Sequence, residues 1–76
     1  MSNKMPRVAA KEVIVAIEKI GFVFSRQTGS HKIYKNLLTG KRVTIPFHGG
    51  KILHPKVLAS IIRDAEFTAE KFKTLL

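Results

Sequence analysis

The sequence contains no cysteine, and only five of its 76 residues are acidic. Without cysteine the fold has no disulfide and no thiolate metal ligand, which fits a protein of the reducing cytoplasm. No segment approaches the run of about 18 apolar residues that a membrane-spanning helix needs. The N-terminus also lacks the apolar stretch of a secretory signal peptide. We therefore expect a soluble cytoplasmic protein that does not enter a membrane.

The few acidic residues also argue against a metal-dependent hydrolase. They lie in or beside segments that we predict to be helical: Glu12, Glu18, Asp64, Glu66 and Glu70. A two-metal nuclease needs several carboxylates that converge on paired ions, and none of these acids is near the glycine-rich segment 46–56. Zinc is disfavoured as well, because a loop separates His48 from His54 and only His31 offers a third ligand. No phosphate-loop or dinucleotide-binding motif is present, and we expect neither a metal nor a cofactor.

Basic residues dominate the charge. Fourteen lysines and arginines give a formal net charge of +9. So large an excess on a single small domain favours an anionic partner, with nucleic acid ahead of an acidic protein or a membrane surface. The hydrophobic content of 45% argues for a folded chain and against disorder.

Two longer segments and one short segment are predicted helices. The first covers about residues 9–20, and the second begins at Pro55, which suits the first turn of a helix. A short last helix follows Thr68, whose hydroxyl suits the N-cap position. Residues 1–8 precede this pattern and are predicted to form a flexible basic N-terminal arm. The single folded domain then covers residues 9–76.

Three segments rich in β-branched and aromatic residues are predicted strands. They cover residues 22–28, 30–36 and 41–45. Gly29 and Gly40 supply short turns, so the strands should form a three-stranded antiparallel meander. Helices with one apolar face need a sheet to cover, and the simplest arrangement places both long helices on one face and leaves the other open. The fold class is therefore α+β, in the order α-β-β-β-α with a short C-terminal helix.

His31 is the best candidate for acid–base chemistry, because histidine gains and loses a proton near neutral pH. Arg26 and Lys32 lie close to it in the sequence. An imidazole beside phosphate-binding cations is suited to take a proton from a ribose 2′-hydroxyl. The alternative is that His31 has only a structural role at the start of a strand. The pattern leaves its direction open: His31 points inward if Ile33 does, and faces solvent if Tyr34 points inward.

The loop over residues 46–56 is a second candidate site. Gly49-Gly50 lets backbone N–H groups approach an anion, and Lys51 and Lys56 flank the start of a predicted helix. His48 could touch a phosphate or hydrogen-bond the loop. The alternative is a flexible connection with solvated lysines.

Three segments, taken together and in order, resemble the HicA toxin family of bacterial toxin–antitoxin systems. They read "AIEKIGFVFSRQTGSHKIYKN", "GKRVTIPFHGGKIL" and "LASIIRDAEFTAEKFKTLL", and the resemblance covers about residues 9–76. Its specific elements are Gly21-Phe22, Gly29-Ser30-His31, Val43-Thr44-Ile45-Pro46, His48 and Lys51.

The resemblance implies a double-stranded-RNA-binding-like fold and a type II toxin that acts as an mRNA interferase, a small ribonuclease that blocks translation. It assigns catalysis to His31, as general acid or base, without a metal. The predicted RNA-binding residues are Ser30, Lys32, Arg26, Arg42, His48, Lys51 and Lys56. The implied partners are messenger RNA and a HicB-type antitoxin, with which the chain would form a hetero-oligomer, and no membrane. The alternative is an RNA-binding module of the same fold that does not cleave.

Overall fold

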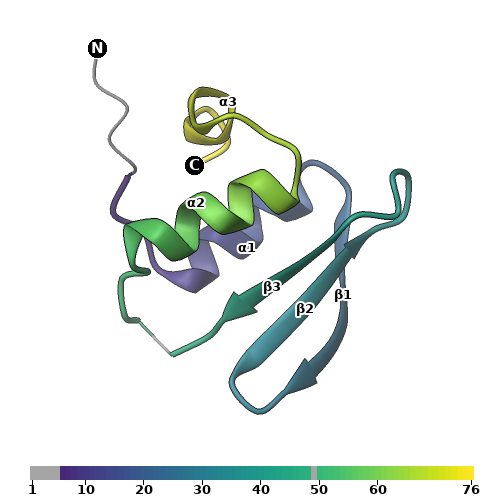
Figure 1. The fold of residues 1–76 in the computed structure, drawn as a ribbon, viewed down its shortest axis with the longest axis horizontal. Coiled ribbons are helices and arrows are strands. Elements are labelled where there is room, and N and C mark those ends of the chain that lie inside the picture. Colours follow the sequence, from purple (N-terminus) through teal and green to yellow (C-terminus); the bar gives the residue numbers. More distant parts are fainter. Residues whose placement is uncertain (1–5, 49) are drawn as a thin grey trace.

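The computed structural model describes residues 6–48 and 50–76, which contain three helices and three strands (Figure 1). In chain order they are α1 (Ala10–Glu18), β1 (Phe22–Thr28), β2 (His31–Asn36), β3 (Arg42–Pro46), α2 (Pro55–Asp64) and α3 (Ala69–Lys73). This order confirms the predicted α+β fold. The first helix is shorter than predicted because the chain turns after Glu18, and Gly21 ends that turn with a φ of 104°.

The strands form one antiparallel sheet in the order β1-β2-β3, which confirms the meander. The buried side chain of Asn36 organises the turn between β2 and β3. Its Oδ1 accepts hydrogen bonds from the backbone N–H groups of Leu38 and Thr39, at 2.8 and 3.2 Å. Its Nδ2 donates to the carbonyl of Ile20 at 3.1 Å. One amide therefore ties this turn to the segment that follows α1.

Both long helices pack on the same face of the sheet, as the sequence predicted (Figure 1). Helix α1 contacts β1 and β3, and α2 contacts β3 and α3. The buried helical residues are Ala10, Val13, Ile14, Ala16 and Ile17 in α1, and Leu58, Ile61 and Ile62 in α2. From the sheet they meet Phe22, Tyr34, Val43 and Ile45. Because each fully buried large apolar side chain contributes about 1.5–3 kcal/mol, this contact holds the helices on the sheet.

The central strand β2 shows which face is open. Tyr34 and Asn36 are buried, with 5% and 6% of their surfaces exposed. Side chains alternate along a strand, so His31, Ile33 and Lys35 lie on the opposite face. Tyr34 is a core residue, and its ring meets Phe24 edge to face with centroids 5.7 Å apart. The structure thus decides the direction of His31, which is exposed on the face that the helices leave uncovered.

The segment between β3 and α2 is anchored to the start of α1. Val8 is buried, and its carbonyl accepts a hydrogen bond from the Leu53 N–H at 2.8 Å. Ala9 and Ile52 form an isolated antiparallel bridge beside it. Residues 1–5 of the predicted N-terminal arm, and Gly49 of the predicted anion-binding loop, lie outside the described residues. These contacts fix the approach of the chain to α2 and position the loop that the sequence analysis singled out.

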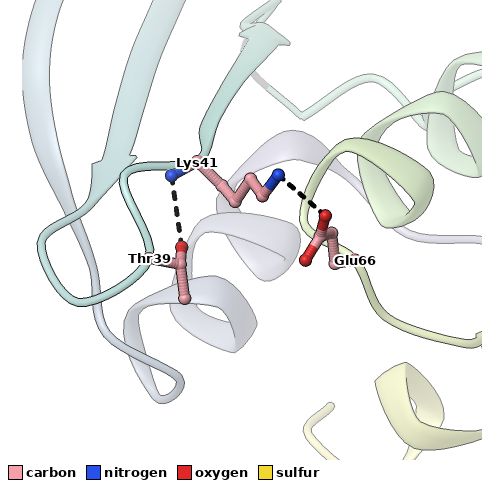
Figure 2. A network of polar contacts seen from close by, with 3 residues as sticks. All are labelled: Thr39, Lys41 and Glu66. Atoms are coloured by element: carbon pink, nitrogen blue, oxygen red, sulfur yellow. Dashed lines mark hydrogen bonds and ion pairs between the residues drawn. The ribbon is translucent and has the colours of Figure 1, made fainter.

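Helix α2 ends in a Schellman motif without glycine. The N–H of Glu66 donates to the Arg63 carbonyl at 2.9 Å, and the N–H of Phe67 donates to the Ile62 carbonyl at 3.0 Å. Glu66 has a φ of 62°, in the left-handed region. Its carboxylate lies 2.8 Å from Nζ of Lys41, which follows the β2–β3 turn (Figure 2). The predicted N-cap of α3 is confirmed, because the Thr68 hydroxyl accepts from the Lys71 N–H at 3.1 Å.

Candidate nucleic-acid interface

The open face of the sheet carries cations and His31. The three strands contain no acidic residue. Strand register places four titratable side chains on this face: Arg26 from β1, His31 and Lys35 from β2, and Arg42 from β3. All four are basic or neutral, so the open face favours an anionic ligand.

His31 sits at the start of the central strand, between two partners. Thr28 of β1 lies opposite it on one side and Pro46 of β3 on the other. The turn before it is held to the end of β3, because the Phe47 N–H donates to the Ser30 carbonyl at 2.6 Å. The imidazole is therefore exposed to a ligand but mounted on backbone that is hydrogen-bonded on both sides.

A β-bulge brings Arg26 onto the face of His31. The register shifts between Phe24, which pairs with Tyr34, and Arg26, which pairs with Ile33. Without the extra residue, Arg26 would pair with Lys32 on the helix-covered face. With it, Arg26 lies diagonally across from His31, at the roughly 7–8 Å spacing that a long side chain spans easily. The bulge therefore places Arg26 on the face of His31, within reach of a ligand that contacts the imidazole.

The register separates two other predicted site residues from His31. Arg42 is on the same face but lies opposite Lys35, four residues along β2 and so about 13 Å away. Lys32 is on the helix-covered face, because it pairs with the buried Ile45. Its Nζ lies 4.0 Å from the centroid of the Phe47 ring, a cation–π contact. Of the three predicted cations on the strands, only Arg26 both shares the face of His31 and lies close to it along the sheet.

The second predicted site surrounds a cavity of about 230 Å³, here called the loop cavity. Its walls come from the β3–α2 loop and the first turn of α2: Pro46, His48, Lys51, Ile52, Leu53, His54 and Val57. The Lys51 N–H donates to the His48 carbonyl at 3.3 Å. Lys56, in the first turn of α2, is exposed next to it. Because Pro46 is the cross-strand partner of His31, one wall residue of the loop cavity lies one strand away from the imidazole.

Sequence reasoning missed two residues of this surface. Lys35 was not singled out, although a residue four positions after His31 in the same strand lies on the same face. That face is the open one once Tyr34 is assigned to the core. His54 was weighed only as a metal ligand. In the structure it caps α2, and its Nδ1 accepts a hydrogen bond from the Lys56 N–H at 3.0 Å. The signal was its position before Pro55, because the residue preceding an N1 proline is the N-cap.

Three further observations concern the chemistry available to the chain. Burial raises the pKa of the Tyr34 phenol, with a smaller effect from Glu18, so this hydroxyl keeps its proton near neutral pH. Among residues 6–48 and 50–76, no group of three or more histidines and acids is arranged to hold a metal ion. None of the helices in these ranges has the length and apolar character needed to cross a membrane.

Comparison with known protein families matches residues 10–67 to the family described as the HicA toxin of bacterial toxin–antitoxin systems. The match covers most of the chain and includes both the His31 turn and the β3–α2 loop. No curated protein sequence matches the chain. With the α-β-β-β-α order, the open sheet face and the family match in agreement, the chain belongs to the HicA toxin family, whose members are toxins of bacterial toxin–antitoxin systems.

Proposed function

We propose that the chain is an mRNA interferase that cleaves RNA on the open face of the sheet, with His31 as the group that transfers the proton. The observation that carries this proposal is the exposure of His31 on strands that contain no acid, one strand from Arg26. RNA supplies its own nucleophile, the ribose 2′-hydroxyl. A single well-placed base and nearby cations are then enough to start cleavage.

The proposed reaction begins with attack of the 2′-oxygen on the adjacent phosphorus, while the neutral imidazole of His31 takes the hydroxyl proton. The bond from phosphorus to the 5′-oxygen of the next nucleotide breaks. That oxygen takes up a proton from the imidazolium or from solvent. The products are a 2′,3′-cyclic phosphate and a 5′-hydroxyl. Charge grows on the phosphate oxygens during attack, and the Arg26 guanidinium is the cation placed to stabilise it.

The rest of the strand cations form a path for the RNA backbone. Lys35 and Arg42 face each other across β2 and β3, further along the open face from His31. Together with Arg26 they allow three phosphate contacts on the sheet, and Lys51 and Lys56 extend the basic surface beyond β3. Three contacts to a single strand predict that the logarithm of affinity falls by about 2 per tenfold rise in salt.

The direct test is cleavage of a labelled messenger RNA in EDTA by the wild type and by His31→Ala. Circular dichroism first establishes that both proteins are folded. We expect the wild type to cleave without metal, and the substitution to lower the rate by about 10²–10⁴-fold. Products carrying a cyclic phosphate identify attack by the 2′-hydroxyl. Equal cleavage by both proteins would remove His31 from the mechanism, and salt-sensitive binding without cleavage would support the non-catalytic RNA-binding module instead.

We also propose that the partner is a HicB-type antitoxin that covers the open face and hetero-oligomerises with this chain. A protein that covers Arg26, Lys35 and Arg42 needs an acidic surface, and such pairs associate rapidly and in a salt-dependent way. A cognate antitoxin should block RNA cleavage, and Lys35→Glu should slow its association. Binding that leaves cleavage unchanged would contradict occlusion of the open face.

A further inference from the structure

We propose that the loop cavity binds one nucleobase of the RNA, next to the cleaved bond, and prefers guanine or uracil to adenine or cytosine. This inference rests on the proposed function, because it assumes that RNA lies across the open face. It adds a base preference to that function and gives a role to His54, which the catalytic site does not use.

The position of the loop cavity makes it a neighbour of the reacting phosphate. Pro46 forms part of its wall and is the direct cross-strand partner of His31. Side chains of paired residues lie on the same face, about 4.5–5.5 Å apart. We therefore expect the nucleotide that follows or precedes the phosphate at His31 to reach the loop cavity.

The size and walls of the loop cavity suit a base better than a phosphate. Its volume of about 230 Å³ lies below the range of roughly 300–1,000 Å³ typical of pockets that hold a drug-sized ligand, and it leaves space for one ring system. Aliphatic side chains make up much of the wall, among them Leu53 and Val57. Such a lining gains from covering a flat apolar ring and gains little from a hydrated phosphate.

The cavity is also held in place by the fold. Leu53 donates its N–H to the buried Val8, and Ile52 bridges to Ala9 at the start of α1. On the other side, Val57 belongs to the first turn of α2 and packs against the core. The walls are therefore formed before the ligand arrives, which lowers the entropic cost of binding.

The hydrogen bond that His54 makes fixes what it offers to a ligand. Its Nδ1 accepts from the Lys56 N–H, so this nitrogen carries no hydrogen. In the neutral ring the hydrogen is then on Nε2, which makes Nε2 a donor. The ammonium group of Lys51, from the other wall, has donors only. The His54 ring and the Lys51 ammonium group therefore both present hydrogen-bond donors to the ligand.

Two donors select bases by their exocyclic groups. Guanine presents O6 and N7 as two neighbouring acceptors and uracil presents O4, whereas adenine has an amino donor beside its N7 acceptor and cytosine has an amino donor in place of a carbonyl. An amino group facing His54 or Lys51 sets donor against donor, so the hydrogen bond that a keto group would accept is not formed. The loop cavity is therefore matched to the keto bases and binds the amino bases less tightly.

The test measures binding rather than cleavage, in the His31→Ala background. Short RNAs that differ at a single central position, guanine against adenine or uracil against cytosine, in an otherwise identical sequence are compared by fluorescence anisotropy. Guanosine and adenosine 5′-monophosphates serve as small probes, with backbone amide shifts of residues 50–54, 56 and 57 as the readout. We expect the keto member of each pair to bind about tenfold more tightly, the effect of one well-formed hydrogen bond.

His54→Ser is the decisive variant, because serine keeps the N-cap of α2 while it removes the Nε2 donor. We expect it to abolish the keto preference and to leave the weaker binding of the adenine RNA unchanged. Val57→Phe, which places a ring in the loop cavity, should remove the preference by a different route. Arg63→Ala, an exposed residue of α2 outside the cavity, should keep it.

The outcomes separate this inference from the proposed function. Equal binding of keto and amino RNAs, or a preference that survives in both His54→Ser and Val57→Phe, overturns the base site even if the wild type cleaves RNA. A His54-dependent preference in a wild type that cleaves nothing supports the base site and refutes the catalytic proposal. Absence of any RNA binding overturns both.

Discussion

Glu66 provides a test of how the fold tolerates a strained residue. It follows α2 at the position where helices that end in a Schellman motif normally carry glycine, and its φ is 62°. A Cβ atom in the left-handed region crowds the neighbouring carbonyl, and glycine has no such atom. We therefore compare Glu66→Ala with Glu66→Gly. Both substitutions remove the carboxylate that contacts Lys41, so the loss of the ion pair cancels between them (Figure 2).

The difference between the two variants isolates the backbone strain. The left-handed conformation costs a residue with a Cβ about 1–2 kcal/mol, and the greater freedom of glycine in the unfolded chain offsets part of that gain. We expect Glu66→Gly to be more stable than Glu66→Ala by about 1 kcal/mol. In a domain of this size that difference raises Tm by about 4–8 °C.

Thermal unfolding followed by far-ultraviolet circular dichroism measures both variants under one set of conditions. Val15 supplies a matched control, because it is 52% exposed and lies inside α1, where φ is helical. At this position the Val15→Ala variant should be more stable than Val15→Gly by about 1 kcal/mol, the reverse of the order at Glu66. If alanine equals or exceeds glycine at position 66 as well, the proposed strain at this helix end is wrong.

Three further predictions follow from particular contacts. Arg26→Ala should lower RNA cleavage about 10²-fold and reduce by about 0.7 the slope of log affinity against log salt concentration. Arg63→Ala, the control, should leave both quantities unchanged. A similar loss in both variants would mean that net charge alone is responsible. Asn36→Ala should destabilise the fold by about 2 kcal/mol in urea unfolding, because three backbone groups lose their partner, and an unchanged midpoint would refute this role. The hydrogen bond to Glu66 raises the pKa of Lys41 above its usual 10.5. The stability that the Lys41–Glu66 ion pair adds to the fold is therefore fully present at pH 8, below the ordinary lysine pKa of 10.5, and is lost as pH rises through the higher folded-state pKa. Wild type and Lys41→Met should differ in stability at pH 8 and converge at strongly alkaline pH.

Local patterns were sufficient to predict the helices and strands. Helical spacing of apolar residues marked both long helices, and Pro55 and Thr68 marked where the last two begin. Gly29 and Gly40 marked the turns of the meander, and both adopt the positive φ that glycine allows. These features depend on a few neighbouring residues, so they can be read without knowing what each element packs against.

The candidate site depended on contacts between elements, and the pattern was less informative there. Ile33 and Tyr34 are both apolar, so the strand alone could not orient His31; the packing of α1 and α2 on the Tyr34 face decided it. Lys32 and Arg26 are equally basic neighbours of His31 in the sequence. The register placed Lys32 on the covered face with its charge over Phe47, and moved Arg26 to the open one.

The sequence by itself determined the order of elements, the basic character of the chain and, through its linked motifs, the resemblance to the HicA toxin family, because propensity, charge and motif are properties of short segments. Only the tertiary structure decided which side chains meet. A bulge at Ser25 carries Arg26 to the face of His31, and the bridge between Ala9 and Ile52 helps to position the wall of the loop cavity. Strand register and loop anchoring arise from hydrogen bonds between residues that are distant in the sequence. A one-residue shift in strand register reverses the face on which a side chain lies.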